Sequence, residues 1–259
     1  MKEEKNNFGI LILGIALVFI VFGVFIYYKN YKNNKPIKTE ENEKIEHKKE
    51  FIEDLYNNIK FNYENDYVVS TIDLEKMKKG YMVSEFSQDL IIAYGLIHLE
   101  ENDIGHEANY KAIVDRDGYR YTGTYVKASL VKGHVSHVLG SGVTYNDKTV
   151  TFRNVRYYYD AKYKIYRIYK NKYNKTIDKI TYYEADWDEE NIYITEYSAY
   201  TYKTNTRYNS FTRYEKILPI GITDKNIREN LDLVDKYKYT FKYNKGTDNY
   251  YLNKIEYVK

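Results

Sequence analysis

Two histidines have the spacing that comes nearest to a metal site. His134 and His137 form a His-x-x-His pair within a segment of helical periodicity. Side chains three residues apart lie on the same side of a helix, so both imidazoles could face one ion. Zinc peptidase sites instead place His at i and i+4 with a Glu between them, whereas Val135 and Ser136 lie between these two. We therefore predict no metal site and no cofactor, with His134 and His137 as the residues to test.

Carboxylates gather at the tip of one predicted hairpin, where Asp186, Asp188, Glu189 and Glu190 follow one another closely. Paired carboxylates can serve as general acid and base, or can supply oxygen ligands to calcium. Calcium loops need alternating acids with a Gly at the sharp bend, which this segment does not have. Acids at a hairpin tip usually only solubilise it. The alternative hypothesis is therefore an enzyme that acts on envelope glycan through paired carboxylates such as Glu184, Asp186 or Asp188.

A glycine-rich triplet, Gly140-Ser141-Gly142, follows a predicted helix. A phosphate-binding loop would precede a helix, where free amides point outward. A nucleophile elbow needs Gly-x-Ser-x-Gly between a strand and a helix. The triplet fits neither pattern, and we interpret it as a helix cap and turn.

Tyrosine is the most unusual feature of the composition, with 34 residues in 259. Tyr joins a wide apolar face to a hydroxyl at low entropic cost, which suits contact with sugars or peptides. The alternative is that Tyr fills strand positions that Phe, Val or Ile would otherwise take. The candidate binding residues are Trp187, Tyr193, Tyr197, Tyr200 and Tyr202.

The composition excludes several classes of function. The chain carries 40 basic and 37 acidic residues, whereas a nucleic-acid binder needs a concentrated basic face. It has no Cys, which excludes thiol catalysis, Cys-liganded zinc, iron–sulfur clusters and disulfides. Its 43% hydrophobic content is too high for a disordered tail.

Residues 8–28 are apolar almost throughout and carry no charge. As a helix this segment is about 31 Å long, which matches the hydrocarbon core of a bilayer. Tyr27 and Tyr28 end it at the position where aromatic rings prefer the membrane interface. A signal peptide would have a shorter apolar core and a small-residue cleavage site. We predict a single-pass membrane protein that contacts the lipid bilayer through residues 8–28.

This anchor sets the predicted organisation: a tail (1–7), the transmembrane helix (8–28), a charged juxtamembrane stalk (29–50) and a soluble domain (51–259) that could divide into two lobes near 105. The lysines at the start of the stalk have no acids among them, so the positive-inside rule would place the domain in the cytoplasm. Large domains translocate largely regardless of charge, however, and a lone N-terminal anchor usually holds its domain outside. We predict an extracytoplasmic domain, with a cytoplasmic-facing accessory domain as the alternative.

The periodicity of the domain changes from helical to alternating along the chain, which predicts an α+β fold with a mostly antiparallel sheet. The expected helices start near Thr39 and near Ser84, and cover 129–139 and about 223–234. Three hairpins are expected, with strands at 148–159 and 163–169, 176–183 and 191–202, and 237–243 and 250–258, and a further strand at 210–217.

Two segments resemble a loose group of uncharacterised membrane-anchored proteins from low-GC Gram-positive bacteria. They are Val138-Leu139-Gly140-Ser141 with Val143-Thr144-Tyr145, and Tyr239-Thr240-Phe241-Lys242 with Asn249-Tyr250-Tyr251-Leu252. In that group the helix more usually ends in Phe-Gly, and an aromatic residue more often stands where this chain has Leu252. The resemblance covers about 119–259. It implies an envelope-facing domain of unknown function and supplies no active site.

The sequence therefore favours a non-catalytic, membrane-tethered binding or structural module that faces the cell envelope. Its expected partners are an envelope polymer or another membrane protein, and not nucleic acid.

Overall fold

The computed structural model describes residues 40–60, 74–97, 99–152, 155–171, 177–203, 208–212 and 216–258. The chain forms two compact units, Met1–Ile52 and Glu53–Lys259, and both sheets described below belong to the second. None of the described helices combines the length and the apolar composition that crossing a bilayer requires. The predicted span at 8–28 lies outside the described residues.

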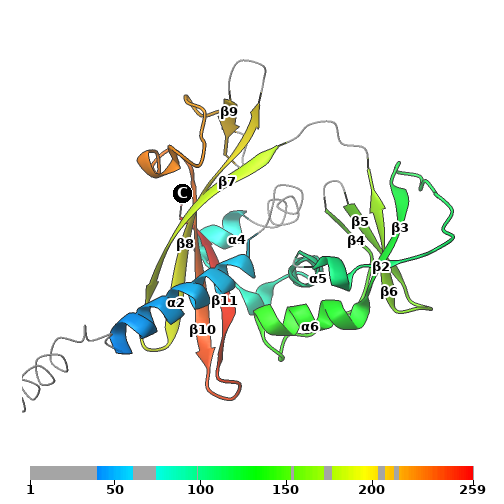
Figure 1. Ribbon diagram of the computed structural model, residues 1–259, viewed down its shortest axis with the longest axis horizontal. Helices are drawn as coiled ribbons and strands as arrows, with labels where there is room; N and C mark the ends of the chain where they lie inside the picture. The colour runs from blue at the N-terminus through cyan, green and yellow to red at the C-terminus, as the bar shows by residue number, and fades with distance from the viewer. Residues whose placement is uncertain are drawn as a thin grey trace, which may run out of the picture. The chain divides into compact units, whose positions relative to one another are not determined.

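The first sheet, sheet A, has six described strands, and every neighbouring pair is antiparallel (Figure 1). Their order is β1-β11-β10-β8-β7, with β9 paired to the end of β8. The strands are β1 (Tyr81–Met82), β7 (Asp178–Trp187), β8 (Asn191–Lys203), β9 (Tyr208–Phe211), β10 (Asp235–Asn244) and β11 (Asn249–Tyr257).

The second sheet, sheet B, has five described strands in the order β2-β3-β6-β5-β4, again antiparallel throughout. The strands are β2 (Gly105–His106), β3 (Arg120–Lys127), β4 (Val150–Phe152), β5 (Val155–Asp160) and β6 (Ile165–Lys170). Helices and two antiparallel sheets make an α+β fold, as the sequence predicts.

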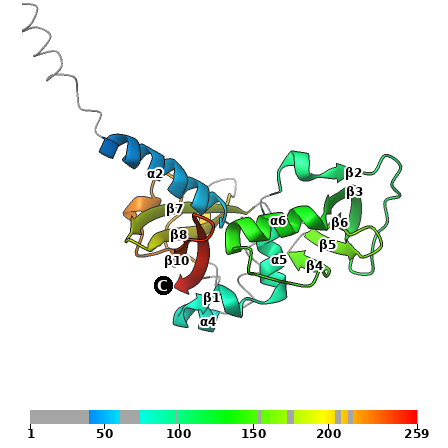
Figure 2. The same cartoon turned by 90° about the horizontal axis from the view of Figure 1, so that it is seen from below.

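The helices are α2 (Glu40–Asn57), α4 (Leu74–Lys79), α5 (Gln88–Leu96) and α6 (Ala128–Leu139), with 3₁₀ turns η1 (Val83–Glu85), η2 (Glu101–Asp103) and η3 (Ile227–Glu229). Helices α5 and α6 pack side by side, and α6 contacts strands of both sheets, β3 and β11 (Figure 2). Their close approach depends on Gly95, because a Cβ there would lie 2.6 Å from the Val131 carbonyl oxygen.

One end of each of these two helices is set by a local residue. Helix α5 begins after Ser87, whose hydroxyl accepts a hydrogen bond from the Leu90 amide, and therefore not at Ser84 as expected. Helix α6 ends at Gly140, as predicted. Gly140 has a φ of +94°, which glycine adopts without the steric penalty of a Cβ.

The two faces of β8 pack against different partners because side chains alternate along a strand. Tyr197 and Ala199 face the segment 216–234 and share a core cluster with Leu218 and Ile222. On the other face, Glu196 is fully buried.

The buried Glu196 carboxylate is paired with Lys179 at 3.0 Å and accepts a hydrogen bond from the Tyr56 hydroxyl at 2.9 Å. Burial, followed by the charge of Glu196, raises the pKa of Tyr56. The Tyr56 ring also packs on Tyr183, with the ring centroids 4.2 Å apart. Tyr56 therefore fixes the last turn of α2 to sheet A. Removing Tyr56 or Lys179 would leave the buried Glu196 carboxylate with one partner fewer, which is costly for a buried charge.

Three expected elements are wrong. The predicted strand 148–159 is two strands, β4 and β5, which pair with each other, Val150 opposite Tyr157. The predicted strand 210–217 reverses direction, since Phe211 pairs with Ile217 in an antiparallel bridge. Alternation gives the strand period but not the position of a reversal within it.

The third is the helix expected at 223–234, which is only the short 3₁₀ turn η3. The Asn226 side chain accepts a hydrogen bond from the Thr223 amide at 2.7 Å and donates one to the Gly221 carbonyl at 2.8 Å. Asn side chains that bond to nearby backbone in this way compete with helix formation.

Candidate functional site

A cavity of about 740 Å³ opens where the β5–β6 hairpin loop, the start of α6 and strand β2 meet. Ligand pockets are typically of this size. We call it the basic cavity, because four cationic side chains line it against two carboxylates. The cationic residues are Lys127, Lys132, Lys164 and Arg167, and the acidic residues are Glu107 and Asp147.

Each carboxylate of the basic cavity is already paired. Glu107 bonds to the Arg167 guanidinium, and Asp147 lies 3.0 Å from the Lys132 ammonium. Within the part of the chain that the structure describes, neither Lys127 nor Lys164 forms an ion pair or a side-chain hydrogen bond. The cavity therefore presents two ammonium groups that no carboxylate neutralises.

Strand register brings these two lysines together. Lys127 ends β3 directly opposite Ile165, the residue after Lys164. The Ala128 amide, at the first position of α6, donates to the Lys164 carbonyl at 3.0 Å. The hairpin loop is thus tied to the start of the helix, and the two side chains belong to adjoining backbone.

The backbone at Lys164 is strained. Its φ is +54°, in the left-handed region that costs a residue with a Cβ about 1–2 kcal/mol. Glycine or asparagine would occupy this position at lower cost. Asp248 has the same conformation at the end of the β10–β11 hairpin turn, so the positive φ belongs to the geometry of these turns.

Arg167 differs from the two free lysines because its Nε and Nη1 groups are already hydrogen-bonded. It bonds to Glu107, to Asp160 at 3.2 Å and to the Tyr121 hydroxyl at 3.2 Å. Burial lowers the pKa of Arg167, but these three partners outweigh it and raise that pKa. In return, burial and the bond network with Glu107 raise the pKa of Tyr121 to about 12. Arg167 therefore braces the wall, and Lys127 and Lys164 supply the uncommitted charge.

Asp147 is held just as firmly. It accepts a hydrogen bond from the Tyr166 hydroxyl at 2.8 Å, and burial together with this bond raises the pKa of Tyr166. Both carboxylates are thus paired with residues of the cavity wall, and the charges that stay free for a ligand are positive. The basic cavity is suited to hold an anionic group.

A second cavity, of about 730 Å³, lies at the other end of α6, and we call it the glycine-loop cavity. Its lining joins Gly140-Ser141-Gly142 to the tip of the β10–β11 hairpin, so the two segments that carry the resemblance meet here. Among the described residues that line it there is no carboxylate, and Lys242 and Lys245 supply two positive charges. The Tyr251 ring packs on Gly140, where a Cβ would lie 3.5 Å from it.

Strand alternation separates the four predicted tyrosines. Tyr193 and Tyr197 lie on one face of β8, and Tyr200 and Tyr202 lie on the other. Only 1% of the Tyr200 surface is exposed. This separation could be predicted from the sequence, because Tyr197 and Tyr200 are three residues apart and an odd interval changes the face of a strand.

The rings of Tyr193 and Tyr197 already contact lysine ammonium groups of the neighbouring strand β10. The Lys238 ammonium lies 4.3 Å from the Tyr193 ring centroid, and the Lys236 ammonium lies 5.4 Å from that of Tyr197. The structure therefore does not form one open tyrosine face on β8.

Trp187 and the acids of 186–190 lie at the β7–β8 tip, whereas Glu184 lies within β7 opposite Thr195. None of them lines either cavity. The exposed fraction of Trp187 is 47%. Asp188 accepts hydrogen bonds from the Tyr193 hydroxyl at 2.7 Å and from the backbone amides of Glu190 and Asn191, which lower its pKa to about 2. Asp188 thus closes the turn.

The two histidines of α6 have different partners. His134 lies 3.4 Å from the Asp103 carboxylate, and His137 lies 3.3 Å from the Asn58 amide nitrogen. The described residues hold no group of three or more potential metal ligands.

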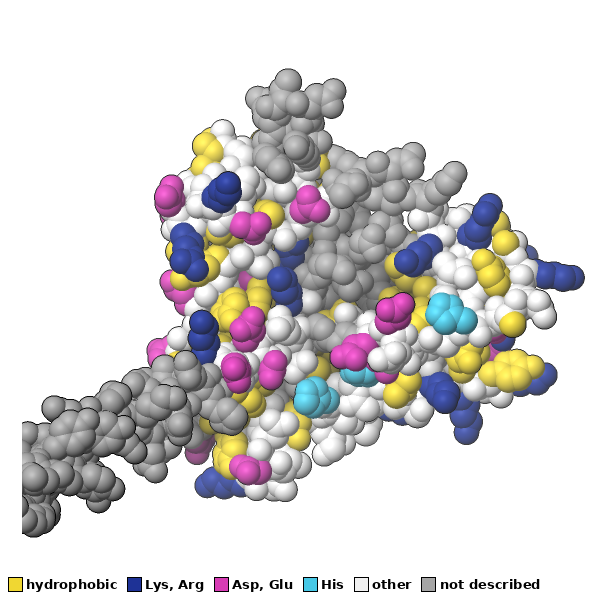
Figure 3. Space-filling view, in the orientation of Figure 1, with side chains coloured by type: hydrophobic (Ala, Val, Ile, Leu, Met, Phe, Trp, Pro, Cys, Tyr) yellow, Lys and Arg dark blue, Asp and Glu magenta, His cyan; other side chains and the backbone are white. Residues whose placement is uncertain are grey.

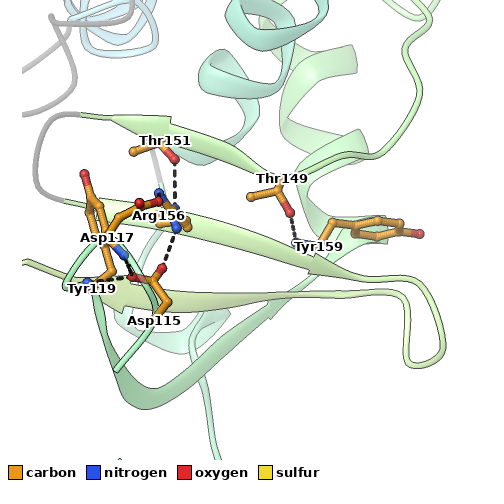
Figure 4. A network of polar contacts seen from close by, with 7 residues as sticks. All are labelled: Asp115, Asp117, Tyr119, Thr149, Thr151, Arg156 and Tyr159. Carbon is orange, nitrogen blue, oxygen red and sulfur yellow. Dashed lines mark hydrogen bonds and ion pairs between the residues drawn. The ribbon is translucent and has the colours of Figure 1, made fainter. Parts of the chain in front are cut away.

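A further cluster of charges is structural. Arg156 bonds to Asp115, to Asp117 at 2.7 Å and to Thr151 at 3.2 Å, and its guanidinium lies 4.5 Å from the Tyr119 ring centroid (Figure 4). These contacts tie the loop before β3 to β4 and β5. Every polar edge of the guanidinium is occupied, so this cluster braces sheet B.

The face of the molecule in Figure 3 shows basic and acidic side chains interspersed, with no broad surface of one sign. Among the described residues, lysines without an ion pair also lie elsewhere, as Lys162 and Lys225 do, so what distinguishes the free lysines described above is that they line one of the two cavities. Sequence reasoning missed both, because their lysines come from distant segments and lie in no motif.

Comparisons with known proteins found no match for the chain among family models, among curated proteins or among solved structures.

Proposed function

We propose that the chain is a single-pass membrane protein, anchored through residues 8–28, whose domain is a non-catalytic binding module for an anionic polymer of the cell envelope. The observation that carries this proposal is the basic cavity, where Lys127 and Lys164 have no carboxylate partner. The anchor comes from the sequence argument on length and apolar composition.

The free cations of the basic cavity are ammonium groups, and lysine is a common phosphate ligand that acts as a point charge. Arginine binds carboxylates and phosphates alike through its planar fork, and in Arg167 two of the three nitrogens are taken by Glu107 and Asp160. The uncommitted groups are lysine ammoniums, which act as point charges and donate hydrogen bonds to the oxygens of a phosphate in many orientations. A polymer that carries phosphate groups is therefore the proposed ligand.

Location is tested by protease treatment of intact cells, followed by detection of the domain with an antibody. We expect the domain to be digested without lysis, since the proposal places it outside. Protection that ends only on lysis would place it in the cytoplasm, as the lysines after residue 28 would favour, and would exclude an envelope polymer as ligand.

Binding is tested with the full chain in detergent micelles and an isolated phosphate-bearing envelope polymer. The variant with Lys127→Glu and Lys164→Glu should lose at least about tenfold in affinity, because two attractive charges become repulsive. The variant with Lys162→Glu and Lys225→Glu is the matched control, since it changes the net charge equally and neither lysine lines the basic cavity or the cavity at the other end of α6. Equal losses in both variants would mean that binding follows net charge and not this site.

A further inference from the structure

Helix α6 has one of the two cavities at each end. Ala128 and Ser129, at its start, line the basic cavity, and Leu139 and Gly140, at its end, line the glycine-loop cavity. Twelve residues of α-helix are about 18 Å long. The two cavities are therefore held at a fixed separation by a rigid element.

The glycine-loop cavity also suits an anion. Lys242 and Lys245 line it, and within the described chain neither forms an ion pair. Its floor is apolar, with Val83, Leu139 and Leu252 all buried. Hydroxyls and amides at the rim belong to Ser84, Ser141, Thr144, Asn244 and Asn253.

The end of α6 makes this cavity the weaker of the two. The last carbonyls of a helix carry partial negative charge, which opposes an anion, whereas the start of a helix favours one. Lys127, which caps the start of α6, makes no side-chain cap bond there. A single short anion should therefore occupy the basic cavity first.

We infer that one polyanionic chain occupies both cavities at once, with α6 as the spacer between two phosphate subsites. This inference rests on the proposed function and makes it more specific: the ligand is a polymer of repeated phosphate groups longer than about 18 Å, and not a single phosphate. Binding at the first cavity raises the effective concentration of the same chain at the second, which adds affinity without any new contact in the first.

The test uses the full chain in detergent micelles and linear polyphosphate of graded length as the probe. Affinity should rise about a hundredfold once the extended probe exceeds about 18 Å, the gain that two linked sites typically give. The variant with Lys242→Ala and Lys245→Ala should bind short probes like the unchanged protein and should lose this rise.

The matched control removes two lysines that line neither cavity, Lys162→Ala with Lys225→Ala. It should keep the length-dependent rise, because only overall charge is changed. A smooth increase with length in all three proteins would overturn the two-subsite inference while leaving the proposed function intact. Absence of binding at every length would instead contradict the proposed function. Equal affinity for poly-glutamate of matched length would overturn the assignment of phosphate.

Discussion

Replacing Lys164 by glycine should make the protein more stable and a weaker binder at the same time. The left-handed backbone at Lys164 costs a residue with a Cβ about 1–2 kcal/mol, and glycine avoids this cost. Against this, glycine lowers the stability by about 0.5–1 kcal/mol, because it gives the unfolded chain more conformational entropy. The net effect is about 0.5–1 kcal/mol of added stability, or about 2 °C in Tm for a domain of this size. The Ala128 amide keeps its acceptor, because that acceptor is the Lys164 backbone carbonyl.

The same substitution removes one of the two free ammonium groups of the basic cavity. Lys164 is exposed, so its attraction for a phosphate lies near the solvent limit of about 1 kcal/mol, which corresponds to about fivefold in affinity. Both quantities can be measured on the full chain in detergent, by thermal unfolding and by titration with short polyphosphate.

Lys162→Gly is the matched control in the same loop. Among the described residues, positive φ outside glycine occurs only at Lys164 and Asp248, so glycine at 162 relieves no strain. We expect Lys162→Gly to lower Tm by about 2 °C and to leave the affinity unchanged. The reasoning would be refuted if Lys164→Gly bound as tightly as the unchanged protein, or if both variants lost stability equally.

Three further predictions concern the scaffold. Gly95→Ala should destabilise the domain by about 1–3 kcal/mol in chemical denaturation, because the new methyl group would overlap Val131 on α6; an unchanged midpoint would show that α5 and α6 do not pack this closely. Arg156→Lys should cost about 2 kcal/mol, since an ammonium cannot replace a fork that binds two carboxylates, and a loss as small as that of an exposed lysine would contradict its bracing role. Tyr193→Phe should raise the pKa of Asp188 from about 2 toward its usual value. Because the folded pKa is depressed, the stability that this carboxylate contributes is present above about pH 4 and is lost as pH falls toward 2. Titration of Asp188 by NMR checks this, and identical curves for both proteins would exclude the hydrogen bond.

The elements that the sequence predicts well are those fixed by local chemistry. Helix α6 follows from its apolar spacing and from Gly140 as its terminator. The β10–β11 hairpin follows from two alternating runs around Gly246. These features depend on neighbours within a few residues, so one sequence is enough.

The elements that it predicts poorly depend on distant partners or on side chains that bond to the backbone. Strand β3 is not predicted from the sequence. Its extended structure depends more on pairing with β6 than on its own residue pattern. The helix expected around Asn226 fails because that side chain offers the backbone another set of bonds.

The candidate site is hidden for a related reason. Lys127 and Lys164 meet only through the register of β3 with β6, and each is one lysine among many in the sequence. Which lysines lack an acidic partner depends on the fold, because the pairing of Glu107 with Arg167 joins distant segments. By contrast, the opposite facing of Tyr197 and Tyr200 could have been predicted from their spacing alone.

Hydrogen–deuterium exchange of the full chain, with and without a short polyphosphate, tests most directly whether the basic cavity is the binding site. The account predicts slower exchange at the start of α6 around Ser129 and in the hairpin loop around Lys164, where a bound phosphate would contact the chain. Slower exchange at the β7–β8 tip around Trp187, with none at the basic cavity, would contradict it and would favour the aromatic tip as the site.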